Sequence, residues 1–219
     1  MCLITFAAAL GIPGAGAAQA PPPEQLPASV PIFPLPDVTL LPHSTQPFHI
    51  FEPRYRAMVA DALAGDSISG MVVLRPGYEA DYEGRPPVYA LGCAGVIVAA
   101  ERLPDGRYDI VLRGLSRFRI LSEDASRSYR LADVEQLAEG AVTDRQLLSS
   151  RRQQLEAAVR AAFPSAPMLR ADLSDEEVID GLAIMLPLEP AQRFELLEAD
   201  GPLERAAILV RLIRGGARA

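Results

Sequence analysis

The sequence predicts an α+β protein, in which a small closed or partly closed β-barrel is followed by a C-terminal helical bundle. Short apolar stretches separated by turn residues recur from Ile32 to about Leu137, with one amphipathic helix among them. After Gly140 the apolar residues recur at helical spacing instead. We therefore divide the chain into residues 1–30, 31–138 and 139–219.

Residues 1–30 are expected to form a signal peptide and a proline-rich tether. Leu3 to Ile12 is an apolar run of leader length, and Ala18-Gln19-Ala20 matches a cleavage site, although no basic residue precedes the run. The run is shorter than the roughly 20 residues that span a membrane. Cleavage would make the protein periplasmic or secreted, whereas retention as an unstructured tail would leave it cytoplasmic.

The barrel region is expected to open with a proline-punctuated strand from Pro31, which leads through an apolar turn into a helix. Pro53 occupies the first helical position, where its missing N–H is not needed, and Gly65 ends the helix. A short apolar strand is predicted at residues 68–74. In the opening segment, the residues expected to pack in the core are Phe33, Leu35, Ile50, Phe51 and Tyr55.

Residues 75–87 contain too much proline, glycine and charge to pair in a sheet, so we expect a long irregular loop there. Residues 92–101 and 107–113 are predicted strands joined by a tight turn at Asp105-Gly106. Two more strands are expected near 118–120 and 129–134. The pattern lacks the crossover helices that a parallel sheet requires.

Four helices are predicted in the C-terminal third. Residues 144–162 place their leucines near one face, and Ser174-Asp-Glu-Glu177 is a capping box in front of the second helix. Pro190 and Pro202 open the last two helices.

Composition argues against several classes of site. The formal charge of −7 and the pI near 4.9 do not favour a surface that binds nucleic acid. Two histidines and two cysteines provide no recognisable metal-ligand spacing, and we expect neither a metal nor a cofactor. Cys93 lies in an apolar run and is predicted to be a buried thiol.

Five motifs occur in an order that resembles a known family. Together they look like the N-terminal substrate-binding domain of Lon proteases, the LON domain, over about residues 30–137, with residues 138–214 similar to the helical segment that follows it. The motifs are Phe33-Pro-Leu35, His49-Ile-Phe-Glu-Pro-Arg-Tyr55, Gly92-Cys-Ala-Gly95, Asp105-Gly-Arg-Tyr108, and Leu112-Arg-Gly114 followed by Arg117-Phe-Arg119.

The resemblance implies a PUA-like β-barrel with a helical extension. All 21 basic residues are arginine, so neither the lysine of a phosphate-binding loop nor a Ser-Lys dyad is present. The chain therefore resembles the stand-alone bacterial members of the family. We expect a non-enzymatic module that binds polypeptide segments or a protein partner, including a protease.

The 75–87 loop carries the predicted binding residues. Tyr78, Tyr82, Arg85 and Pro86 include residue types that form binding hot spots, although the loop could equally be a connector with incidental aromatics. Glu52 and Arg54 either face a ligand or form an internal ion pair, and the sequence does not separate these two readings.

Two alternative functions remain open. A small hydrolase could use His43 and Ser44, although no nucleophile elbow surrounds this serine. A PUA-like RNA-binding protein could use Arg113, Arg117 and Arg119. However, Arg117 and Arg119 alternate with apolar residues, as expected for a strand whose polar face lies in water.

Overall fold

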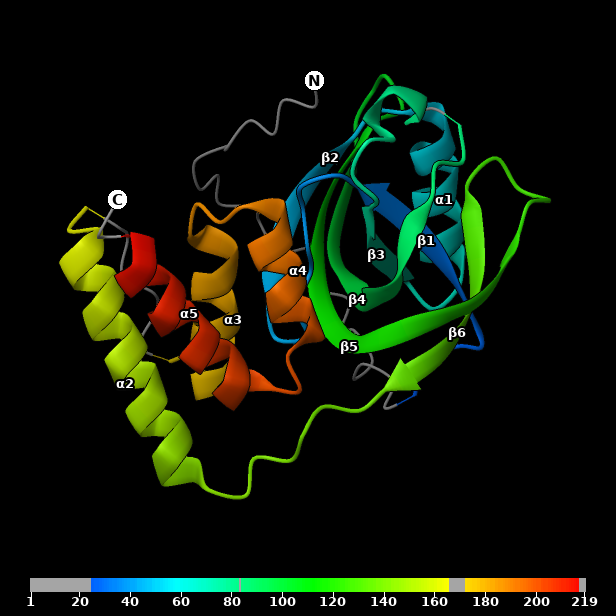
Figure 1. Ribbon diagram of the computed structural model, residues 1–219. Coiled ribbons are helices and arrows are strands. Elements are labelled where there is room, and N and C mark those ends of the chain that lie inside the picture. The colour runs from blue at the N-terminus through cyan, green and yellow to red at the C-terminus, as the bar shows by residue number, and fades with distance from the viewer. Residues whose placement is uncertain (1–24, 83, 166–171, 217–219) are drawn as a thin grey trace.

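The computed structural model describes residues 25–82, 84–165 and 172–216 (Figure 1). The predicted signal peptide and most of the tether lie outside these residues. The described elements are β1 (Ser29–Leu35), β2 (Thr45–Ile50), α1 (Pro53–Ala64), β3 (Ile68–Leu74), the 3₁₀ turn η1 (Glu79–Asp81), β4 (Val88–Arg102), β5 (Tyr108–Asp124), β6 (Arg130–Leu137), α2 (Arg145–Ala162), α3 (Asp175–Met185), α4 (Pro190–Glu198) and α5 (Pro202–Gly216).

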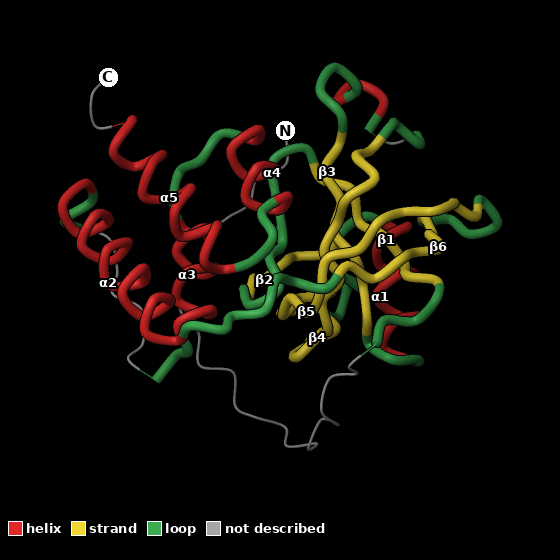
Figure 2. Tube along the Cα trace, turned by 60° about the horizontal axis from the view of Figure 1, so that its bottom comes forward, coloured by secondary structure: helices red, strands yellow, loops and turns green. Residues whose placement is uncertain are grey.

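The strands form one mixed sheet in the order β2-β5-β4-β3-β1-β6. Strand β6 pairs with β1 and also with the second half of β5, so the pairings run from β5 through β4, β3, β1 and β6 back to β5. Helices α2 to α5 lie together on one side of the strands, and α1 lies on the other side (Figures 1 and 2). A mixed sheet with five α-helices agrees with the predicted class, whereas the barrel, the bundle and the division at residue 138 stay predictions.

Three features of the sheet differ from the sequence prediction. The stretches predicted as separate strands at 107–113 and 118–120 are one long strand, β5, which reaches β2, β4 and β6. Strands β1 and β3 pair in parallel, because α1 lies between them in the chain and supplies the crossover that we had not expected. Strand β2 forms despite Pro47, since it is an edge strand and its proline needs no ladder hydrogen bond on the open side.

The core confirms most of the residues expected in it. Leu35, Ile50 and Tyr55 are buried, and Phe33 is half-buried with its ring centroid 4.2 Å from that of Tyr55. The prediction for Phe51 is wrong, because its side chain is 48% exposed and stacks on His49 outside the core. Cys93 is buried, as predicted.

The helix boundaries follow their local signals. Pro53 begins α1 and the Gly65 N–H donates to the Ala62 carbonyl at its end. Ser174 and Glu177 form the predicted capping box at α3. Within the described ranges, no helix combines the length and the apolarity that crossing a membrane requires.

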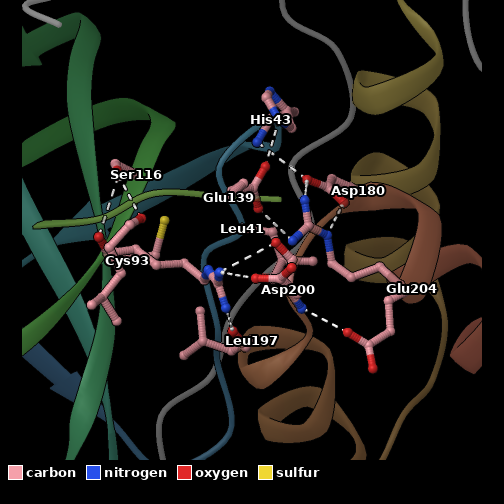
Figure 3. Close-up of polar contacts among 12 residues, drawn as sticks. Leu41, His43, Cys93, Ser116, Glu139, Asp180, Leu197, Asp200 and Glu204 are labelled. Carbon is pink, nitrogen blue, oxygen red and sulfur yellow. Dashed lines mark hydrogen bonds and ion pairs between the residues drawn. The ribbon is translucent and has the colours of Figure 1, made fainter. Parts of the chain in front are cut away.

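A buried arginine, Arg205, joins the helices to the strands by binding Asp180 and Glu139, both of which Figure 3 labels. Arg205 of α5 is fully buried and donates to both carboxylate oxygens of Asp180 on α3, at 2.6 and 2.9 Å. It also donates to Glu139, which follows β6, at 2.5 Å. Glu139 in turn bonds Nε2 of His43 in the β1–β2 loop at 3.0 Å. One guanidinium thereby connects α3 and α5 with the end of β6 and, through Glu139, with the loop before β2.

Arg117 of β5 makes a second connection, and here the sequence prediction is wrong. The alternation around Arg117 predicts a side chain that faces water, yet it is only 6% exposed. Its guanidinium donates to carbonyls at the end of α4 and beside it, where a helix leaves its last carbonyls unpaired. The acceptors are the carbonyls of Leu197, Glu198, Ala138 and Asp200, at 3.1 to 3.4 Å.

At this junction the pKa values of His43 and Glu139 shift in opposite directions. Burial lowers the pKa of His43, but the hydrogen bond that its ring donates to Glu139 and the charges of Asp180 and Glu139 outweigh burial and leave the pKa above its usual value. Burial raises the pKa of Glu139, but His43 and Arg205 outweigh this and bring it to about 2. Each of the two groups therefore favours the charged form of the other.

Arg205→Ala is expected to lower the free energy of unfolding by about 3–5 kcal/mol, because it leaves the Asp180 carboxylate buried without a partner. Urea unfolding followed by circular dichroism measures this change. The matched control on the same helix is Arg211→Ala, whose pair with Glu195 is exposed and is expected to contribute about 1 kcal/mol or less. Equal losses in the two variants would contradict the role assigned to Arg205.

Stability is expected to fall on both sides of a window between about pH 4.5 and pH 6.5. The native-state pKa of Glu139 is lowered to about 2, so its contribution is present above pH 4.5 and is lost as the pH falls toward 2. The native-state pKa of His43 is raised, so its contribution is complete below 6.5 and is lost as the pH rises through the native-state value. Urea unfolding across this range should show that Glu139→Gln weakens the acidic slope and His43→Gln the alkaline slope.

Candidate functional site

The 75–87 loop is anchored at several points. The Arg75 N–H donates to the Pro87 carbonyl at 3.0 Å and closes the base of the loop. Turn η1 and the hydrogen bond from Gly84 N–H to the Asp81 carbonyl, at 2.8 Å, shape its tip. The loop is therefore a folded unit, which argues against the reading of a loose connector.

Arg54 ties this loop to the start of α1. Its Nε donates to a carboxylate oxygen of Glu52 at 2.9 Å, and its Nη2 donates to the Tyr82 carbonyl at 2.9 Å. The guanidinium also lies over the rings of Tyr55 and Tyr82, 4.6 and 4.9 Å from their centroids. The sequence left two readings open for Glu52 and Arg54, a role in ligand binding or an internal ion pair. The structure shows the internal ion pair.

Arg85 and Pro86 tie the other end of the loop to the hairpin of β5 and β6, which projects at the right of Figure 1. Arg85 donates to the carbonyls of Asp124 and Arg127, at 3.4 and 3.1 Å. The Pro86 carbonyl accepts from Nη1 of Arg130 at 2.7 Å. Loop, helix start and hairpin are thus held against one another.

A cleft of about 350 Å³ lies between these three segments. This volume is at the lower end of the range typical of ligand sites. Helix α1 contributes two lining residues, the loop two and the hairpin five. The lining residues are Arg54, Tyr55, Gly84, Arg85, Ala125, Arg127, Ser128, Tyr129 and Arg130.

The lining of this arginine cleft is basic. Four of the nine described lining residues are arginines, and none of the nine is acidic. The carboxylates that pair with three of these arginines do not line the cleft: Glu52 binds Arg54, Asp61 binds Arg127 at 2.7 Å, and Glu123 binds Arg130 at 2.6 Å. The described surface that a ligand would meet therefore consists mainly of guanidinium groups, tyrosine rings and main chain.

Two tyrosine hydroxyls are buried beside Arg54. Among the described residues, neither the hydroxyl of Tyr55 nor that of Tyr82 forms a hydrogen bond of normal geometry. Burial raises the pKa of both phenols, and each phenol affects the pKa of the other. Both hydroxyls therefore stay protonated, and each lies close enough to interact with the other.

The predicted site residues divide into three groups. Arg54 and Arg85 line the cleft. Glu52, Tyr82 and Pro86 instead hold the segments that form it. Tyr78 is 46% exposed and lies outside the lining.

Sequence reasoning missed the contribution of the β5–β6 hairpin. Arg127, Tyr129 and Arg130 occur within four residues of one another in the chain. That concentration of basic and aromatic residues was the available signal. Their approach to Arg54 depends on the pairing of β5 with β6 and of β6 with β1, which the sequence does not reveal.

His43 and Ser44 do not face each other as a catalytic pair would. The Ser44 hydroxyl is buried, donates to the Leu41 carbonyl at 2.8 Å and accepts from the Leu41 N–H at 3.0 Å. The His43 ring bonds Glu139 instead. This serine closes its own turn, so the geometry does not favour its use as a nucleophile.

Within residues 25–82, 84–165 and 172–216, no group of three or more histidine, cysteine, aspartate or glutamate side chains is placed to hold a metal ion.

Comparison with known proteins identifies the relatives of this chain. The model of the ATP-dependent protease La (LON) substrate-binding domain family matches residues 29–215. Lon protease 2 of Sorangium cellulosum is 28% identical over 187 residues, which cover 85% of this chain and 22% of that protein. Lon protease of Anaeromyxobacter dehalogenans is 30% identical over 139 residues, which cover 60% of this chain and 16% of that protein. The chain thus spans about a fifth of the length of these relatives.

Solved structures of Lon N-terminal domains are also similar. A Lon N-terminal domain protein from Xanthomonas campestris aligns with a TM-score of 0.56 and 26% identity, over 84% of this chain and 97% of that chain. The N-terminal domain of a Mycobacterium avium complex Lon protease aligns with a TM-score of 0.56 and 23% identity, over 85% of this chain and 98% of that chain, and this likeness concerns the fold alone. Since the family model matches most of its length, the chain belongs to the LON substrate-binding domain family.

Proposed function

We propose that this protein is a recognition module that binds exposed segments of polypeptide chains and does not itself cut them. The observation that carries the proposal is the match of the LON substrate-binding family across residues 29–215. The anchored 75–87 loop and the arginine cleft beside it provide a shaped surface for such segments. A protease, in the same or in a separate chain, is the partner that this function requires.

The local geometry favours this function over the two alternatives. The Ser44 hydroxyl is occupied by its own turn, which argues against the hydrolase. Arg117, which the RNA reading needs at the surface, is buried against the end of α4. The acidic net charge also argues against binding a long polyanion.

Binding of an unfolded protein tests the proposal directly. Fluorescently labelled β-casein, which has no stable fold, is titrated with the full chain and followed by anisotropy. A folded protein of similar size and charge serves as the control ligand. We expect saturable binding of casein and none of the folded protein, whereas the absence of casein binding would overturn the proposal.

Tyr78→Ala is expected to weaken casein binding severalfold and to change the free energy of unfolding by about 0.5 kcal/mol or less. The side chain is 46% exposed, so it can contact a ligand without supporting the core. Anisotropy and urea unfolding measure the two effects. Leu121→Ala is the matched control, since that side chain is also apolar and exposed but is carried by β5. Equal weakening in both variants would argue against a specific contribution from the loop.

Tyr82 is expected to act on stability instead. Tyr82→Ala removes a ring that packs on the core and on Arg54, and should lower the free energy of unfolding by about 1–3 kcal/mol. Tyr82→Phe removes only a buried hydroxyl without a normal hydrogen bond, so stability should stay the same or rise. A loss in Tyr82→Phe as large as that in Tyr82→Ala would show that the hydroxyl has a partner in solution.

A further inference from the structure

We propose that the arginine cleft is a carboxylate-binding subsite, which selects acidic side chains or the C-terminal carboxylate of a bound polypeptide. This inference rests on the proposed function and names the chemistry that one part of the site recognises. The carboxylate is the shared ligand group, and its two sources are separated by the experiment below.

The arrangement of charge in the cleft is the first reason. Its described lining residues hold four guanidinium groups and no carboxylate, although the chain as a whole has a formal charge of −7. Glu52, Asp61 and Glu123 pair with three of the arginines without entering the lining. An incoming carboxylate would therefore meet donors at the surface, with the compensating negative charges set apart from it.

Arg85 is the second reason. It is exposed, and the hydrogen bonds that hold it run to the main-chain carbonyls of Asp124 and Arg127. Unlike the other three arginines of the cleft, it has no ion pair with a carboxylate of the described residues. Its positive charge is thus positioned by main-chain carbonyls, and it interacts with the Asp124 carboxylate through charge without a close ion pair. A ligand carboxylate can therefore bind it without breaking an ion pair to a described carboxylate.

The rigidity of the cleft is the third reason. Arg130 is only 8% exposed and is fixed by two bonds to Glu123 and one to the Pro86 carbonyl. Arg54 is fixed by Glu52 and the Tyr82 carbonyl. A ligand therefore does not have to order these long side chains on binding, which preserves affinity.

The size of the cleft limits what it recognises. About 350 Å³ accommodates one or two residues of a polypeptide, whereas a long polyanion would extend over the acidic remainder of the surface. The subsite therefore fits a single carboxylate within an otherwise uncharged segment. Because Arg85 is exposed to solvent, added salt screens its attraction for a ligand carboxylate, so we expect binding to weaken as salt is added.

Four labelled peptides of about ten residues test the proposal, since this length suits an extended segment with one charged group. They share an unstructured apolar and polar sequence and differ in two places. The central residue is Asp or Asn, and the C-terminus is free or amidated. Anisotropy titrations with the full chain at about 50 mM and about 300 mM sodium chloride give the dissociation constants.

We expect at least one carboxylate-bearing peptide to bind about tenfold more tightly than the neutral one at low salt, the advantage typical of one charge-assisted hydrogen bond. Arg85→Gln should remove this advantage, Arg85→Glu should reverse it, and Arg85→Lys should retain part of it. The control Arg151→Gln removes the same charge from an exposed arginine of α2 and should leave the advantage intact. Circular dichroism establishes that each variant is folded.

The pattern across the peptides decides the outcome. Preference for the Asp peptides identifies a side-chain carboxylate, and preference for the free C-terminus identifies a terminal one. If all four peptides bind equally and Arg85→Gln has no effect, the subsite is wrong while the proposed function stands. If none binds and casein also fails, the proposed function is wrong too. Binding of a short single-stranded RNA that depends on Arg85, with no peptide binding, would overturn both.

Discussion

The buried guanidinium of Arg205 is the interaction on which the arrangement of this protein depends. It is removed from water and satisfied by the carboxylates of Asp180 and Glu139. A buried charge is tolerated only when its partners are correctly placed, so few other arrangements of these helices and strands would satisfy Arg205. Arg205 consequently fixes the positions of α3, α5 and the end of β6 relative to one another. Through Glu139 it also fixes His43 in the β1–β2 loop.

The same interaction bears indirectly on the candidate site. Glu139 follows β6 closely, and β6 begins with Arg130, which forms part of the cleft wall. Arg117 adds a second attachment between β5 and the end of α4. The strands that carry the hairpin side of the cleft are therefore braced by the helices, although the cleft itself contains no residue of α2 to α5. This explains how helices outside the site can contribute to its shape.

Arginine serves two different purposes in this lysine-free chain. Arg117, Arg130 and Arg205 are buried and use several donors at once on carbonyls or carboxylates, which the planar guanidinium permits. Arg85 in contrast is exposed and bonds only carbonyls among the described residues. Residue type alone did not separate the two uses. The alternation around Arg117 suggested a solvated side chain, yet a helix end covers that face of the strand.

Much of the fold was determined by local signals that act within a few residues. Pro53, Gly65 and the Ser174 capping box set helix ends, and the turn at Asp105-Gly106 joins β4 to β5 with Gly106 at a φ of +82°. The ordered motifs also sufficed to indicate the family. These features are readable because their physical cause lies in adjacent residues.

Only the tertiary structure decided which distant residues meet. The parallel pairing of β1 with β3, the burial of Arg117 and the exposure of Phe51 depend on segments far away in the chain. The cleft likewise forms where α1, the 75–87 loop and the β5–β6 hairpin converge. Composition and spacing identified Arg54 and Arg85 as candidates, but the charge environment of each is set by partners from other elements. Local sequence therefore determined the elements and the family, whereas long-range packing determined the site.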